Sequence, residues 1–261
     1  MCDCIKRLNF QWFGEFISLN HRQRTGAIKG KSRRIGFSSA CIGSGYFTMG
    51  LMRVSICHYD CLERRDSMDG SFFALISRMR YISRWGLMRN STPENIQEHS
   101  HMVAVLAHAL AVIRRDIFKK PCNPDRAATL ALFHDASEIL TGDLPTPIKY
   151  NNPDIRTAYK NVEHMAAERL LGFLPQAIRC TYAPLLCEQD SQLYELVKAA
   201  DKLSAYIKCI DERKAGNTEF LSAERSTKNA IAEMELPEAD YFFKHFLPAF
   251  EWNLDELGMI E

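Results

Sequence analysis

The sequence has no hydrophobic run long enough to cross a membrane. Its longest apolar stretch, Met102–Ile113, has 12 residues and includes a histidine, whereas a membrane-spanning helix needs roughly 20 apolar residues. An excess of charge is also lacking, because 33 basic residues face 32 acidic ones and the formal net charge is +1. We therefore expect neither a membrane nor a nucleic-acid polymer as a partner.

Disulfide-rich and secreted proteins are also excluded. Nine cysteines, an odd number spread over 261 residues, do not suit a disulfide scaffold. The first residues, Met1–Phe16, contain two acids and no continuous apolar segment, so they do not resemble a secretory signal peptide. The proportions of 46% apolar and 25% charged residues are those of an ordinary globular protein.

Residues 1–67 differ in composition from the rest of the chain. They hold 11 Lys and Arg against 5 Asp and Glu, with 7 of the 13 glycines and no sustained apolar periodicity. We expect a poorly structured N-terminal extension over 1–67, or a true start at Met68. An organellar transit peptide is an open alternative for this segment, since Arg and Ser outnumber the acids. Zinc binding by its closely spaced cysteine pairs is disfavoured.

From residue 68 onward the sequence predicts only helices, and we expect 68–261 to form one all-α domain. Ser91–Glu94 combines hydroxyl caps, a proline and an acid, which is typical of a helix start, so a helix is predicted over 91–115. Another is predicted over 124–140, where Gly142–Pro147 stops it. Further helices are expected near 71–84, 154–172, 189–214, 219–234 and 239–256.

Four side chains that can bind a metal lie on helix faces that packing alone would fill with Leu or Ala. They are His99, His134, Asp135 and Asp201. Taken singly, each would more often be a structural residue. Taken together they favour a site, because a buried carboxylate needs a partner and one divalent cation can serve all four groups. Two imidazoles and two carboxylates suit Co, Mn, Fe, Ni or Zn better than Ca.

The pattern His99…His134-Asp135…Asp201 matches the H…HD…D signature of the HD-domain metallophosphohydrolases, an all-helical superfamily. From Met68 to about Glu256, the chain resembles more closely the bacterial 5′-deoxynucleotidases of the YfbR type. The strings that carry this resemblance are RWGLMRN at 84–90, EHS at 98–100, HDASEILTGDLPTPIKY at 134–150 and AD at 200–201. It implies an HD-domain helical bundle, a cytoplasmic homodimer, and removal of phosphate from deoxyribonucleoside 5′-monophosphates with a divalent metal, Co²⁺ by preference and Mn²⁺ as an alternative.

Arg84 and Trp85 are the candidates for holding the substrate. A phosphomonoester needs its non-bridging oxygens held and screened, and the planar fork of arginine suits this better than lysine. From composition alone, Arg84 could equally be a solvated arginine at a helix end or a residue that binds phosphate. The resemblance favours the catalytic role. Trp85 is either a core residue or a wall beside phosphate and sugar, and we favour the wall. The metal ligands His99, Asp135 and Asp201 are also predicted to contact substrate.

Glu138 follows His134 by one helical turn and faces the metal pair. Direct binding would make it a fifth protein ligand, so a role as the acid or base that serves the attacking water or the leaving 5′-oxygen is more economical. Asp143, on the following turn, is either a simple turn residue or a substrate contact. The resemblance also implies a wall against the ribose 2′-hydroxyl, for which Trp85 and the segment Leu144-Pro145-Thr146 are the candidates.

Two other functions stay open. Another HD enzyme, a phosphodiesterase or a deoxynucleoside triphosphate triphosphohydrolase, would use the same four ligands, but a triphosphate needs more cations near the metal than residues 84–150 offer. A non-catalytic helical scaffold would keep the metal for folding alone. A structural ion does not require an acid and an arginine beside it, which favours an enzyme.

Overall fold

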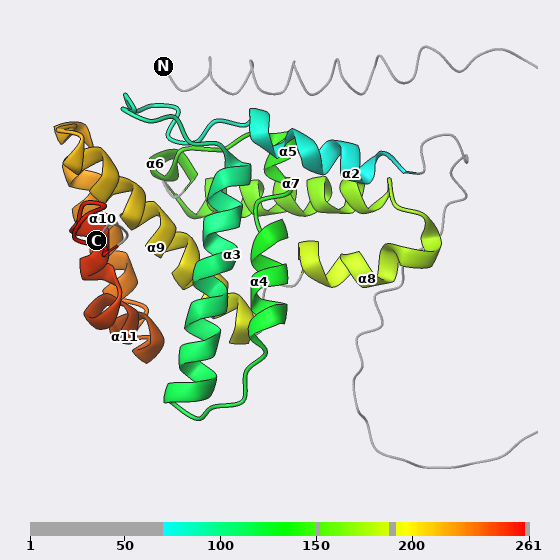
Figure 1. Ribbon diagram of the computed structural model, residues 1–261. Helices are drawn as coiled ribbons and strands as arrows, with labels where there is room; N and C mark the ends of the chain where they lie inside the picture. Colours follow the sequence, from blue (N-terminus) through cyan, green and yellow to red (C-terminus); the bar gives the residue numbers. More distant parts are fainter. Residues whose placement is uncertain (1–69, 150–151, 188–191, 259–261) are drawn as a thin grey trace, which may run out of the picture. The chain divides into compact units, whose positions relative to one another are not determined.

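The computed structural model describes residues 70–149, 152–187 and 192–258, and these ranges are helical (Figure 1). The predicted N-terminal extension over 1–67 and the alternative start at Met68 lie outside the described residues. Within the described ranges the prediction of an all-α fold is confirmed, and an isolated bridge between Ser83 and Asn95 is the extended pairing that they contain.

The helices follow one another with short connections. They are α2 (Ser71–Ile76), the 3-10 helix η1 (Ser77–Tyr81), α3 (Ile96–Val112), the π-helical turn η2 (Ile113–Ile117), α4 (Pro124–Phe133), α5 (Glu138–Thr141), α6 (Thr146–Lys149), α7 (Pro153–Leu171), α8 (Gln176–Cys187), α9 (Gln192–Lys214), η3 (Thr218–Phe220), α10 (Leu221–Ala232), α11 (Pro237–His245) and η4 (Leu247–Glu251). None of the described helices has the length and hydropathy of a membrane span.

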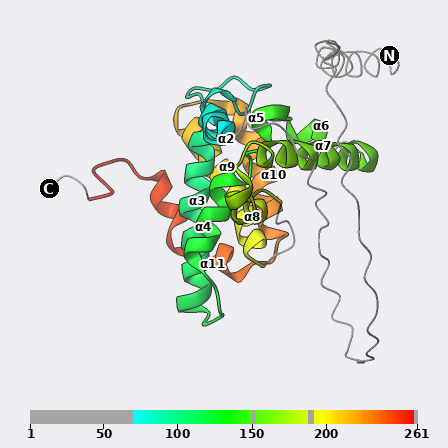
Figure 2. The ribbon, with the colours of Figure 1, turned by 90° about the vertical axis from the view of Figure 1, so that its right-hand side faces the viewer.

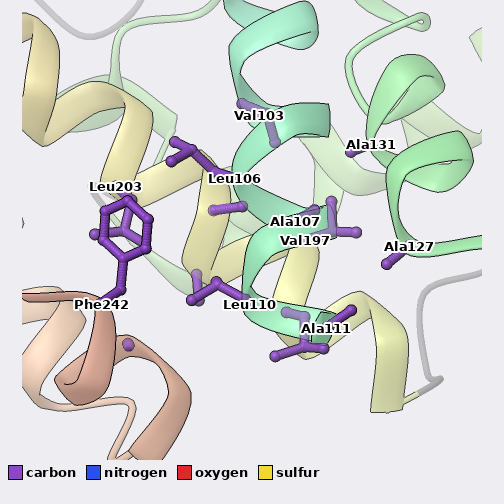
Figure 3. Close-up of a cluster of buried hydrophobic side chains, with 14 of the residues drawn as sticks. Val103, Leu106, Ala107, Leu110, Ala111, Ala127, Ala131, Val197, Leu203 and Phe242 are labelled. Atoms are coloured by element: carbon purple, nitrogen blue, oxygen red, sulfur yellow. The ribbon is translucent and has the colours of Figure 1, made fainter. Parts of the chain in front are cut away.

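The core lies where α3, α4 and α9 pack together, and both ribbon views show α3 beside α4 (Figure 1, Figure 2). Small residues of α4, Ala127 and Ala131, face the apolar stripe of α3 and permit close approach of the two helices. The buried side chains of this core include Val103, Leu106, Ala107, Leu110, Ala111, Val197, Leu203 and Phe242 (Figure 3). This packing brings the start of α3 and the end of α4 to the same end of the core.

The start of α3 differs from the prediction. Asn95 is the N-cap, and its side-chain oxygen accepts hydrogen bonds from the N–H groups of Gln97 and Glu98 at 3.0 and 3.1 Å. The predicted start at Ser91–Glu94 is therefore wrong by several residues. The N–H groups of Ser91 and Thr92 donate to the Glu212 carboxylate instead of opening a helix. The helix over 91–115 also ends differently, in the π-helical turn η2.

The predicted helix over 124–140 is interrupted. It ends at Phe133, the four residues from His134 form a turn, and Glu138 opens the separate helix α5. The reason is a switch to tighter bonding, because the N–H groups of Ala136 and Glu138 donate to carbonyls three residues back. The His-Asp pair thus lies at a helix end and not in the middle of a helix.

The predicted stop at Gly142–Pro147 is correct at its first residue, since Gly142 follows α5 with a φ of 73°. The prolines do not exclude all helix, because α6 begins at Thr146 with a proline in its first turn, where a missing N–H costs nothing. The predicted helix near 71–84 ends at Tyr81, as α2 followed by η1. Two helices, α6 and α8, were not predicted.

Candidate functional site

The four predicted metal ligands lie together. His99, from the first turn of α3, His134, at the end of α4, and Asp201, from α9, place their ligand atoms within 4.8 Å of one another. The Asp135 Oδ2 atom lies 3.7 Å from His99 Nε2 and 3.2 Å from His134 Nε2. The start of α3, the end of α4 and the middle of α9 therefore bring two imidazoles and the Asp201 carboxylate together, with the Asp135 carboxylate beside the two imidazoles.

The His99 ring is held on both of its nitrogens. The side chain is fully buried, with Nε2 3.0 Å from Asp201 Oδ1 and Nδ1 3.2 Å from Ser204 Oγ. Asp201 and Ser204 are three residues apart on α9 and so share a face. A hydroxyl that accepts from Nδ1–H leaves the Nε2 lone pair directed at the site. Sequence reasoning assigned Ser204 no function, although its spacing from Asp201 was visible.

His134 provides the test of whether a metal fits. Its Nδ1 lies 2.7 Å from the Ala131 carbonyl, an oxygen that can only accept, so Nδ1 carries the proton and Nε2 the lone pair in the neutral ring. Nε2 is buried and lacks a hydrogen bond within the described residues, although the Asp135 carboxylate faces it. Two acceptors that face each other require a cation or a proton between them. The residues present therefore fit a bound divalent metal ion.

The pKa values of His134 and Asp201 reflect the carboxylates and histidines gathered around them. Burial lowers the pKa of His134, but the Asp135 and Asp201 carboxylates outweigh burial, and the pKa is raised above its ordinary value. Burial raises the pKa of Asp201, whereas the His99 hydrogen bond and the two histidines lower it to about 2. The carboxylates are therefore held in the ionised form that a metal ion requires.

Arg84 and Trp85 reach the site from the connection between η1 and α3. Arg84 Nε donates to Glu94 Oε2 at 3.1 Å, and its Nη1 lies 3.5 Å from Asp135 Oδ2. Trp85 Nε1 donates to the same Glu94 oxygen at 2.9 Å. The structure thus places Arg84 beside Asp135, and its role in holding phosphate stays a prediction. Glu94, expected to be an acid of a helix first turn, lies before α3 and contacts both side chains.

Glu138 and Asp143 complete the acidic part of the site. Glu138 is 5% exposed, and one of its carboxyl oxygens has no hydrogen bond within the described residues. Burial, together with the nearby Asp135 and Asp143, raises its pKa to about 9. Burial also raises the pKa of Asp143, although Arg84 and a hydrogen bond from the Trp85 N–H act against it. Without a bound metal ion, Glu138 therefore carries a proton near neutral pH.

The structure locates the residues that were predicted to lie against the sugar, but it does not test that role. Trp85 lies at the site, packed on Phe220 with ring centroids 5.2 Å apart. Leu144 and Pro145 are half-buried in the connection after α5, and Thr146 opens α6. Their role at the ribose remains a prediction.

Comparisons of the sequence with known proteins identify a matching family and similar relatives. The YfbR-like family, described as 5′-deoxynucleotidase YfbR-like, matches residues 71–250. A 5′-deoxynucleotidase of Erwinia tasmaniensis is 48% identical over 189 residues, which cover 72% of this chain and 96% of the relative. A 5′-deoxynucleotidase of Vibrio parahaemolyticus is 47% identical over 195 residues, covering 73% and 99%.

Solved structures share the fold. An HD-domain phosphohydrolase of Listeria innocua has a TM-score of 0.62 at 25% identity, covering 69% of this chain and 88% of that one. The cyanophage S-2L HD phosphohydrolase DatZ, solved with dA and one catalytic Zn²⁺ ion, has a TM-score of 0.51 at 21% identity, covering 73% and 99%.

Proposed function

Because the chain belongs to the YfbR-like 5′-deoxynucleotidase family, we propose that it hydrolyses deoxyribonucleoside 5′-monophosphates to deoxyribonucleosides and phosphate. The observation that carries this proposal is the family match over 71–250, which includes every proposed site residue. The test is phosphate release from a panel of 5′-mono-, di- and triphosphates, each as the deoxy and the ribo form, with added Co²⁺ or Mn²⁺. Preferred release from triphosphates would favour the triphosphohydrolase alternative, and no release at all would favour a scaffold.

His99, His134, Asp135 and Asp201 are the proposed ligands of a divalent metal ion, supported by the convergence of His99, His134 and Asp201 and by the Asp135 carboxylate that faces His134 Nε2 at 3.2 Å. When bound, such an ion supplies Lewis-acid chemistry: it lowers the pKa of water and screens phosphate charge. The preference for Co²⁺ follows from the resemblance alone. The test of this preference starts from protein whose bound metal has been removed. Phosphate release is then measured after addition of Co²⁺, Mn²⁺, Zn²⁺, Ni²⁺ or Fe²⁺.

The remaining roles fall to side chains around the ligands. Arg84 holds non-bridging phosphate oxygens with its guanidinium, and Trp85 lies against the sugar. In hydrolysis, water forms the new P–O bond and the bond to the 5′-oxygen breaks, and that oxygen must gain a proton. Glu138 is the proposed donor, because its raised pKa keeps it protonated near neutral pH. Asp143 is a proposed substrate contact beside the Trp85 N–H.

Further substrate contacts are proposed for His99, Asp135, Asp201, Leu144, Pro145 and Thr146. A homodimer is also proposed from the resemblance, and light scattering during size-exclusion chromatography tests it by the mass of the eluting particle. The cytoplasmic location stays a prediction.

Arg84→Lys is expected to weaken phosphate binding although it keeps the charge. Lysine cannot donate to Glu94 and to a phosphate oxygen in the fixed directions of a planar fork. We expect kcat/KM for a deoxyribonucleoside monophosphate to fall by roughly 10- to 100-fold, the loss of one or two charge-assisted hydrogen bonds. Steady-state kinetics at saturating metal measure it. Unchanged kinetics would show that Arg84 does not contact the phosphate.

A chain that begins at Met68 is expected to retain metal binding and activity. The family match begins only at residue 71, and relatives are covered over 96–99% of their length by about 72–73% of this chain. The shortened and full-length proteins should have the same kcat and KM within about twofold. An insoluble or inactive short form would show that residues 1–67 contribute to the domain.

A further inference from the structure

We propose that Glu94 is a positioning residue that fixes Arg84 and Trp85 relative to each other, and that it thereby sets the discrimination between deoxyribose and ribose. This inference rests on the proposed function of the two residues that Glu94 contacts. It assigns a role to a side chain that is neither a metal ligand nor a substrate contact.

A single oxygen atom of Glu94 joins the two groups. Its Oε2 accepts from Arg84 Nε at 3.1 Å and from Trp85 Nε1 at 2.9 Å. The Arg84 and Glu94 side chains are only 12% and 16% exposed, so solvent competes weakly for these bonds. The backbones of Arg84 and Glu94 are also hydrogen-bonded, because the Arg84 N–H donates to the Glu94 carbonyl at 2.9 Å. The guanidinium and the indole are thus oriented by one common acceptor.

Trp85 needs such an anchor. Its φ is 59°, in the left-handed region that bulky residues rarely adopt, so its backbone conformation persists only where surrounding contacts hold it. The described contacts include the Glu94 bond, the Phe220 ring, the bond from its N–H to Asp143 and the bond that its carbonyl accepts from the Met88 N–H at 2.8 Å. Loss of the Glu94 bond frees the end of the indole that carries Nε1.

Orientation, not charge, is what Glu94 contributes to Arg84. Asp135, Asp201 and Asp143 also act electrostatically on the guanidinium, so Arg84 keeps acidic neighbours without Glu94. Glu94 occupies Nε, which turns the Nη1 atom toward Asp135 and the metal ligands. An arginine without this bond would keep its charge but lose its direction.

The test compares Glu94→Gln with Glu94→Leu in the full chain. Glutamine keeps one oxygen that can accept from both donors, whereas leucine has a similar size and no acceptor. For Glu94→Leu we expect the ratio of kcat/KM for deoxyribo- over ribonucleoside monophosphates to fall by roughly 10-fold or more, with KM raised and metal content unchanged. For Glu94→Gln we expect the ratio to stay within about threefold of the unchanged protein. Glu219→Gln is the control, because exposed Glu219 accepts from the Arg89 N–H of the same connection and has no described contact with Arg84 or Trp85.

A second measurement does not depend on the reaction. In a Trp12→Phe, Trp252→Phe background, acrylamide quenching reports on Trp85 alone. Glu94→Leu should increase the quenching of Trp85, and Glu94→Gln should not. Failure of the unchanged protein to hydrolyse any monophosphate would overturn the proposed function, and the quenching result would still decide the positioning role.

Two results would overturn the role of Glu94. One is a Glu94→Leu protein with an unchanged sugar ratio and unchanged quenching. The other is an equal loss in Glu94→Gln and Glu94→Leu that is accompanied by a lower melting temperature or by loss of metal, which would show that Glu94 only supports the fold.

Discussion

Asp135→Ala should lose bound metal and phosphatase activity together. The Asp135 carboxylate lies 3.2 and 3.7 Å from the Nε2 atoms of His134 and His99, so its removal takes one of the four proposed ligands and leaves His134 Nε2 without the carboxylate that faces it. Removal of residues that merely support a ligand costs roughly 10- to 100-fold in metal affinity, and we expect a ligand itself to cost more than about 100-fold. Mass-spectrometric metal analysis and phosphate release measure the two losses, and His134→Ala should behave in the same way.

The matched control is Asp125→Ala. Asp125 also belongs to the α4 region, but its side chain is 95% exposed and its described ionic neighbour is His108. This variant should keep its metal and its turnover. A fully occupied and fully active Asp135→Ala protein would remove Asp135 from the site, and loss of activity with full occupancy would show that Asp135 serves the substrate and not the ion.

Parts of the site could be predicted because they depend on local periodicity. His99 lies three residues after Ile96 and four before Val103, two apolar positions of the same stripe, and all three side chains are buried. The adjacency of His134 and Asp135 needs no tertiary information either. On α9, the Asp201 carboxylate reaches His99, but its side chain is 42% exposed. Helical spacing was therefore enough to predict the inward direction of His99.

Other features depend on contacts between distant segments. The sequence around Ser91 contains every local signal of a helix start, but buried Glu212, about 120 residues later, takes the N–H groups that would have opened the helix. Glu94 is an ordinary first-turn acid until the chain folds back and brings Arg84 and Trp85 to it. Helix α8 was missed because Pro184 lies inside it, where sequence rules place a break.

Glu138→Gln should keep metal and fold while turnover falls by roughly 10²- to 10⁴-fold, the usual effect of losing one acid–base group. Glutamine has nearly the same shape, but its amide cannot supply the proton that the leaving 5′-oxygen needs. Single-turnover phosphate release and metal analysis separate chemistry from binding. Glu195→Gln, an exposed acid of the first turn of α9, is the control and should leave turnover unchanged. Loss of metal in Glu138→Gln would identify Glu138 as a ligand instead.

The same variant should change how the stability of the chelator-treated protein depends on pH. Burial raises the pKa of Glu138 from 4.5 to about 9, so the folded chain keeps a proton that the unfolded chain releases above about pH 4.5. Its contribution is fully present below pH 4.5 and is lost progressively as pH rises toward 9. Glutamine has no proton to lose, so the melting temperature of Glu138→Gln relative to the unchanged protein should increase from pH 4.5 to pH 9, by about 2–4 °C for each kcal/mol. A difference that does not change with pH would show that Glu138 titrates normally, and its role as the proton donor would fail with it.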